Sequence, residues 1–157
     1  MTDHRQFTFT FKLLDHGWAE STVRDGDTIL ELETSYICDP LGDLARVVID
    51  LHRSPGWERF CSWETEPGEF RWLLNAAGEG VNVKILWFRS CYPRLTNERG
   101  ELVFESTASY RRIATQVCGQ MKRVLNECGP IGYRKSWKRD FPERELKALI
   151  KEIEGLD

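Results

Sequence analysis

The beginning of the chain alternates hydrophobic and polar residues with a period of two. Phenylalanine and leucine alternate with threonine and lysine over residues 6–14, which is typical of a strand with one buried face. Residues 17–24 and 27–37 alternate in the same way around Asp25-Gly26, a dipeptide that favours a tight hairpin turn. The pattern therefore predicts three antiparallel strands.

The spacing of hydrophobic residues changes after Asp39 and Pro40. Leucine and valine recur at helical intervals over residues 41–51, with Asp39 in the position of an N-cap and Pro40 at the first helical position. Ser54-Pro55-Gly56 is expected to end this helix.

Four more strands are predicted in the middle of the chain. Residues 60–65 and 70–75 flank Pro67-Gly68, a pair suited to the centre of a type II turn. Residues 81–88 and 101–106 provide two further strands. They are separated by the longest loop expected in the chain, and long ordered loops are often functional.

The register of the hairpin at Pro67-Gly68 follows from counting outward from the turn. It places Trp63 opposite Trp72 on a buried face and Glu64 opposite Arg71 on a solvent-exposed face. The acidic residues around the turn are expected to be solvated.

Helical periodicity returns in the last third of the chain. A wide hydrophobic stripe runs from Ser109 to Gly129-Pro130, where the helix is expected to end. Asp140 and Glu143 have the spacing of a capping box at the start of a last helix. The order βββ-α-ββββ-αα predicts one α+β domain over 1–157, with a mainly antiparallel sheet of about seven strands and helices packed on one face.

The composition agrees with a soluble globular domain. The 157 residues are 41% hydrophobic and 30% charged, with a net charge of −3, which excludes a disordered chain and a membrane protein. The five cysteines are odd in number and none form a Cys-x-x-Cys pair, so neither a disulfide framework nor a zinc site is predicted. Residues 1–7 lack the pattern of an export signal. We therefore expect a cytoplasmic protein with free thiols.

The sequence lacks the motifs of common enzymes. It contains no Gly-x-Ser-x-Gly motif and no glycine-rich phosphate loop, and His4, His16 and His52 lack the spacing of metal ligands. A dyad of Cys61 with His52 has no third group to orient it, and a histidine at a helix end beside the helix dipole is the alternative. We assign no catalytic residue, cofactor or metal ligand, and expect a protein that is not an enzyme.

A surface on the first hairpin is the main candidate for partner binding. Pairing across Asp25-Gly26 places Glu20 opposite Glu31. It also places Trp18 opposite Glu33, and turns the hydrophobic side chains to the other face. Like charges directly opposite each other destabilise a sheet, whereas tryptophan often anchors interfaces. These four residues are predicted to bind another protein; the alternative is an ordinary solvated sheet face.

The long loop offers a second candidate site. Arg89, Tyr92 and Arg94 lie within it, and their side chains could hold an anion. This alternative would make the protein a small enzyme or a metabolite-binding protein with a pocket near residues 89–100.

A third candidate site comes from the uneven distribution of charge. Residues 1–80 contain seven Lys and Arg against fifteen Asp and Glu, a net charge of −8, whereas residues 81–157 carry +5. The most basic segment interleaves cations with aromatic residues, as a nucleic-acid contact would. The residues of this segment are Arg134, Lys135, Trp137, Lys138 and Arg139. Because the isoelectric point is about 5.7, we favour a loop that Trp137 docks onto the core.

Three stretches resemble small bacterial proteins of about this length with no established activity. They are residues 36–44, residues 61–69, and Gly132-Tyr133 with Trp137 and Phe141-Pro142. The resemblance implies a bacterial origin and no mechanism. Many bacterial immunity proteins have a similar size and polarity. This similarity is an association and does not by itself assign a function. The sequence therefore predicts a cytoplasmic interaction module, immunity-like or regulatory, with an acidic, tryptophan-containing sheet face.

Overall fold

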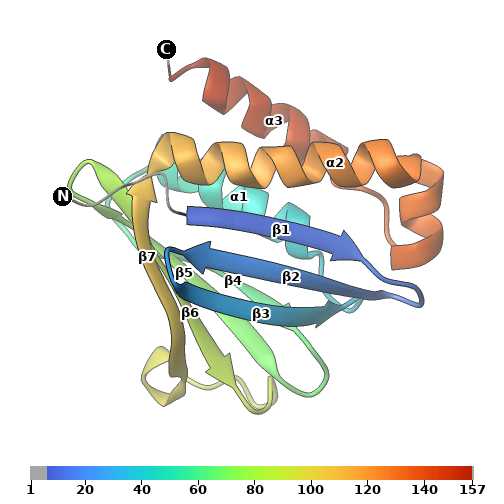
Figure 1. Ribbon diagram of the computed structural model, residues 1–157. Helices are drawn as coiled ribbons and strands as arrows, with labels where there is room; N and C mark the ends of the chain where they lie inside the picture. The colour runs from blue at the N-terminus through green and yellow to red at the C-terminus, as the bar shows by residue number, and fades with distance from the viewer. Residues whose placement is uncertain (1–6, 157) are drawn as a thin grey trace.

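The computed structural model describes residues 7–156. Over these residues the chain forms seven strands, three α-helices and a short 3-10 turn (Figure 1). In chain order they are β1 (Phe7–Leu13), β2 (Trp18–Asp25), β3 (Thr28–Ser35), α1 (Pro40–Arg53), β4 (Arg59–Glu64), β5 (Glu69–Ala77), β6 (Gly80–Phe88), η1 (Asn97–Arg99), β7 (Glu101–Ser109), α2 (Tyr110–Trp137) and α3 (Glu143–Glu154).

The predicted α+β class and antiparallel strands are confirmed, but the strands form two sheets. One has the order β1-β2-β3 and the other the order β4-β5-β6-β7. The inner faces of the sheets pack on each other, with the Phe9 ring 6.1 Å from Trp63 and 5.9 Å from Trp72. The division follows the chain, because α1 connects β3 to β4 in place of a hairpin.

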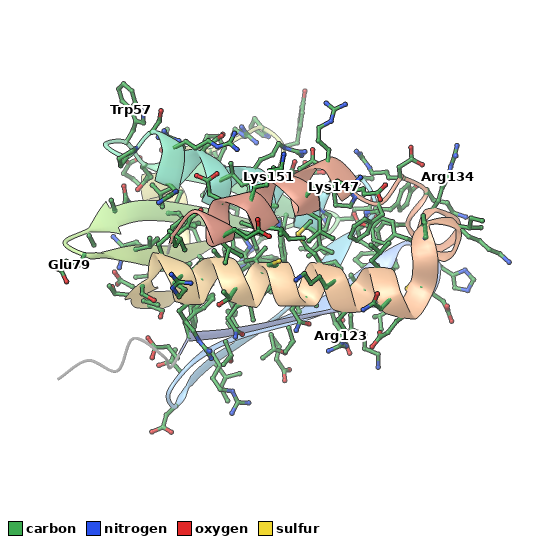
Figure 2. All side chains as sticks on the ribbon, turned by 90° about the horizontal axis from the view of Figure 1, so that it is seen from above. Trp57, Glu79, Arg123, Arg134, Lys147 and Lys151 are labelled. Atoms are coloured by element: carbon green, nitrogen blue, oxygen red, sulfur yellow. The ribbon has the colours of Figure 1, made fainter. Side chains whose placement is uncertain are left out.

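The helices gather on one side of the two sheets (Figure 1). The helix α2 lies along β1, α1 packs on β4 and β5, and α3 contacts both α1 and α2. Figure 2, seen from above, shows Lys147 and Lys151 on the outside of this helical layer. Within residues 7–156 no helix combines the length and apolar character needed to cross a membrane.

The start of α1 is as predicted. The Asp39 side chain accepts a hydrogen bond from the Gly42 N–H, and Pro40 is the first helical residue. Proline is tolerated there because its missing N–H would have no partner within the helix. The buried face of the helix covers Trp63, whose Nε1 donates to the Pro40 carbonyl at 3.1 Å.

The helix predicted to end at Gly129-Pro130 does end there, but a second helical segment of α2 follows directly. Gly129 interrupts the helix with φ 68° and ψ 168°, but helical structure resumes at Pro130 and continues to Trp137. Pro130 occupies the first position of this second helical segment, where proline is well suited. The basic segment expected to be a loop is therefore largely helical.

The predicted capping box of α3 is wrong. Pro142 precedes the helix as its N-cap residue and makes no side-chain capping bond. Asp140 is instead exposed and lies 3.5 Å from the Arg134 guanidinium. Phe141 is buried against Tyr133 and positions the connection through its packing.

We expect two glycine substitutions in α2 to change stability in opposite directions. Gly129→Ala should lower the free energy of unfolding by about 1–3 kcal/mol, because its backbone conformation is nearly restricted to glycine. Gly119→Ala should raise it by about 0.5–1 kcal/mol, because Gly119 is helical, exposed and has open space around the added methyl group. Urea unfolding of both variants checks this. A Gly129→Ala protein as stable as the parent would contradict it.

The register of the first hairpin differs from the prediction by two residues. Glu20 lies opposite Glu33, Thr22 opposite Glu31, and Trp18 opposite Ser35. The two central turn residues are Gly26 and Asp27, with Gly26 at φ 60°, as a type II′ hairpin turn requires. Because a shift of two residues preserves the faces, the acidic side chains remain together on the exposed face.

The second hairpin shows the same kind of shift. Trp63 lies opposite Phe70, and Glu64 lies opposite Glu69. The type II turn predicted at Pro67-Gly68 is wrong, because Thr65 N–H bonds to the Gly68 carbonyl and closes a turn centred on Glu66 and Pro67. The core face was predicted correctly, since Trp63 and Trp72 are both buried.

The outer face of the four-stranded sheet is not fully solvated, in contrast to the prediction. Glu69 and Arg71 are only 1% and 3% exposed. A second small core of Leu73, Leu86 and Phe88 lies beside them, with Leu95 from the long loop packed against it. The loop therefore covers part of a face that alternation alone assigned to solvent.

Candidate functional site

A groove lies where the three-stranded sheet ends and the four-stranded sheet continues. Its volume is about 470 Å³. It is bordered by β2 and β3 on one side and by β5, β6 and the β4–β5 turn on the other. The residues that line it are Glu20, Ser21, Thr22, Glu31, Leu32, Glu33, Thr65, Phe70 and Trp87.

One side of the groove is acidic. Glu20, Glu31 and Glu33 are exposed and extend from the outer face of β2 and β3. Glu20 and Glu33 are direct cross-strand neighbours, and like charges in such positions destabilise a sheet. Within residues 7–156 these three carboxylates make no hydrogen bond or ion pair, and the nearest cross-strand cation is Lys12 of β1, directly opposite Glu20.

The floor of the groove is aromatic. Phe70 and Trp87 are paired across β5 and β6, and their rings are 4.8 Å apart. Both are half-buried, whereas Trp72 and Ile85, the next pair on the same face, are buried in the core. The three-stranded sheet therefore leaves the end of this inner face partly uncovered.

Three of the four predicted partner-binding residues line the groove. Trp18 does not line it, because it lies toward the other end of β2, opposite Ser35. Phe70 and Trp87 were not predicted as floor residues. Their period-two spacing with Trp72 and Ile85 indicates the buried face, but it does not indicate where the opposing sheet stops.

The predicted anion-binding cluster in the long loop is dispersed. Arg94 lines a different cavity of about 590 Å³, but Arg89 and Tyr92 are not among its lining residues. Tyr92 is 87% exposed, and the Arg94 guanidinium lies 5.4 Å from the centre of the Phe60 ring. The carboxylates that line this cavity are Asp39, Asp43, Asp50 and Glu64. They oppose binding of an anion, even though Arg46 and Arg139 also contribute to the lining.

Arg71 holds the long loop onto the sheet. Its guanidinium pairs with both oxygens of Glu69, at 2.9 and 3.1 Å. Its Nη1 donates to the Leu95 carbonyl and to Asn97 Oδ1, at 2.9 and 2.8 Å. The guanidinium also lies 4.2 Å from the centre of the Phe88 ring. Because these bonds satisfy the buried pair locally, we assign it a structural role.

The basic segment does not present an aromatic stacking surface. Trp137 and Tyr133 are fully buried, and Trp137 Nε1 donates to the Cys38 carbonyl at 3.2 Å. The prediction that Trp137 docks this segment onto the core is confirmed. Arg139 donates to the backbone carbonyls of Tyr36 and Ile37. Arg134, labelled in Figure 2, lies at the solvent-facing end of the helical layer.

Helix geometry explains why the basic segment contains both buried aromatic residues and exposed cations. Tyr133 and Trp137 are four residues apart and share one helix face, while Arg134, Lys135 and Lys138 are exposed. A single-stranded nucleic acid would need an exposed aromatic side chain to stack on. The segment provides cations without that platform.

The pairing of Cys61 with His52 is not found. His52 Nδ1 lies 2.7 Å from Glu152, and its ring stacks on Tyr110 at 4.5 Å. Burial raises the pKa of the Cys61 thiol well above its ordinary value, so this cysteine is protonated and unreactive at neutral pH. His52 lies in the last turn of α1, as expected for a histidine at a helix C-terminus.

The other histidines and the cysteines were also considered as metal ligands or reactive thiols. His4 lies outside the described residues. Across the part of the chain that the structure describes, no three His, Cys, Asp or Glu side chains converge to hold a metal ion. The five cysteines are free thiols.

Comparison with known proteins leaves the groove as the main guide to function. Neither a family model, nor a curated protein, nor a solved structure matches the chain.

Proposed function

We propose that this protein is a non-enzymatic, cytoplasmic interaction module, regulatory or immunity-like, that binds a basic segment of another protein. The groove beside β3 is the binding site. The observation that carries the proposal is the combination of three exposed carboxylates with a half-buried aromatic floor in one groove. Aromatic floors supply binding energy through burial, and unpaired charges at the rim select a partner of opposite charge.

The acidic side of the groove supports a basic partner. The local charge comes from Glu20, Glu31 and Glu33, whose repulsion lowers the stability of the free hairpin. A cation placed between them would relieve that repulsion. The floor of Phe70 and Trp87 provides hydrophobic contact for an apolar side chain beside the cation.

We expect Glu33→Lys to weaken binding while making the free protein slightly more stable. The probe is the acetylated and amidated peptide Lys-Val-Lys-Phe-Lys-Val-Lys, titrated at low ionic strength by calorimetry. Charge reversal should weaken its binding about fivefold to tenfold. It should also raise the free energy of unfolding by about 0.2–1 kcal/mol, because the new lysine pairs with Glu20 across the strands.

The matched control is Glu79→Lys. Glu79 lies in the exposed β5–β6 turn, away from the groove (Figure 2), and its substitution causes the same change of net charge. It should leave the affinity within about twofold of the parent. An equal loss of affinity in both variants, or no binding of the peptide to the parent protein, would contradict the proposed function.

A further inference from the structure

Among residues 7–156, the outer edge of β3 presents backbone groups without partners. In an antiparallel pair, alternate residues direct their N–H and C=O groups toward the neighbouring strand. Tyr36 N–H donates to the Gly17 carbonyl at 2.9 Å, and the register is continuous from there to the turn. Even-numbered residues of β3 therefore bond to β2, whereas Ile29, Glu31 and Glu33 direct their backbone groups to the open edge.

The opposite edge of the same sheet is formed by β1, and side chains of α2 bond to its backbone groups. Gln116 and Gln120 of α2 accept hydrogen bonds from the backbone N–H groups of Phe9 and Phe11, each at 3.0 Å. Arg112 donates to the Phe7 carbonyl at 2.8 Å. Within residues 7–156 no comparable bond reaches the outward backbone groups at positions 29, 31 and 33. One edge is capped by side chains, and the other remains open.

The three-stranded sheet is also too narrow to cover the sheet that faces it. The ends of β5 and β6 extend below β3 in Figure 1. There Phe70 and Trp87 continue the inner face beyond the buried pair Trp72 and Ile85. A fourth strand beside β3, placed about 4.8 Å from it, would lie over these two rings. The groove thus has the position that an added strand would occupy.

We propose that the partner segment binds as a fourth, antiparallel strand on the edge of β3, with basic residues alternating with apolar ones. This inference rests on the proposed function. The apolar side chains would face Phe70 and Trp87, and the basic ones would lie on the outer face beside Glu31 and Glu33. The antiparallel direction matches every ladder within the described residues 7–156.

The charges on β3 argue against a second copy of this chain as the occupant. Antiparallel pairing of two β3 edges would bring Glu31 and Glu33 of one copy beside the same carboxylates of the other. Like charges directly opposite each other are destabilising, and charged edges prevent such self-pairing. A basic segment has the complementary charge.

Backbone methylation of the Lys-Val-Lys-Phe-Lys-Val-Lys peptide tests the binding mode without altering the protein. In antiparallel pairing, the lysines that lie opposite Glu31 and Glu33 direct their N–H groups toward β3. N-methylation of the two central lysines should therefore weaken binding by at least about tenfold. N-methylation of the phenylalanine and one valine modifies the edge that faces away, and should change the affinity by less than about threefold.

Amide hydrogen exchange provides a second measurement. Saturating the protein with the unmodified peptide should slow exchange at Ile29, Glu31 and Glu33, and should leave Leu30 and Leu32, already paired with β2, nearly unchanged. Equal affinities for all three peptides would overturn strand addition but leave the proposed basic partner intact. Preferential loss with the phenylalanine-methylated peptide would overturn the antiparallel direction. Failure of all three peptides to bind would overturn the proposed function itself.

Discussion

Arg71→Met is expected to lower the free energy of unfolding by about 3–5 kcal/mol. The change leaves the Glu69 carboxylate buried without its partner, at a position only 1% exposed. Breaking one half of a buried ion pair is costly for this reason. It also removes the bonds to Leu95 and Asn97 that hold the long loop. Urea unfolding followed by circular dichroism measures the loss.

Two controls separate the effect of burial from the effect of charge. Arg123→Met removes an exposed pair with Glu127 on α2, and should cost no more than about 0.5 kcal/mol. Replacing Glu69 with Gln in the Arg71→Met background should recover part of the lost stability, because the buried side chain at position 69 is then uncharged. If Arg71→Met and Arg123→Met were equally stable, the structural role of the pair would be refuted.

Trp137→Ala is the second substitution with a large expected effect. It should lower the free energy of unfolding by about 3–5 kcal/mol, because it removes a fully buried aromatic side chain. The Trp137 ring packs 6.4 Å from Phe11, and its Nε1 hydrogen bond to the Cys38 carbonyl would also be lost. Thermal unfolding should show a clearly lower melting temperature.

The matched control for this change is Trp57→Ala. Trp57 is 71% exposed in the connection between α1 and β4, so its removal should change stability by less than about 0.5 kcal/mol. A Trp137→Ala protein that melts like the parent while losing affinity for single-stranded nucleic acid would show that the tryptophan is exposed in solution. That outcome would restore nucleic-acid binding by residues 133–139 as a candidate function.

The proposed site and the stabilising residues occupy different parts of the protein. Arg71 binds Glu69 on the outer face of the four-stranded sheet, whereas the groove lies on its inner face beside β3. Trp137 belongs to the helical layer. The stability variants therefore test the fold, and the groove variants test binding, without a shared residue.

Periodicity in the sequence was sufficient to predict the elements. Alternation identified all seven strands, and helical spacing with Asp39 and Pro40 located the start of α1. These features are local, because strand and helix periods depend on which neighbouring residues share a face. The acidic face of the first hairpin was predicted for the same reason: even a register error of two residues leaves Glu20, Glu31 and Glu33 on one side.

Tertiary contacts decided how the chain continues after Gly129. Glycine and proline predict a helix end, but Pro130 can also begin a new helical segment. The four-residue spacing of Tyr133 and Trp137 is the signal that favours this second outcome. The number of cations in the segment made a solvated loop the more obvious interpretation, because exposed charge does not distinguish a loop from an amphipathic helix.

Local patterns along the chain are therefore enough to specify the class of the fold, its elements and the composition of their faces. Which faces meet depends on contacts between segments far apart in the chain. Glu69 and Arg71 are buried because a loop distant in sequence covers them, and Phe70 and Trp87 are half-exposed because the opposing sheet ends at β3. Period-two alternation assigns a side chain to a face. Whether that face is covered depends on the width and position of another sheet, which no local pattern specifies.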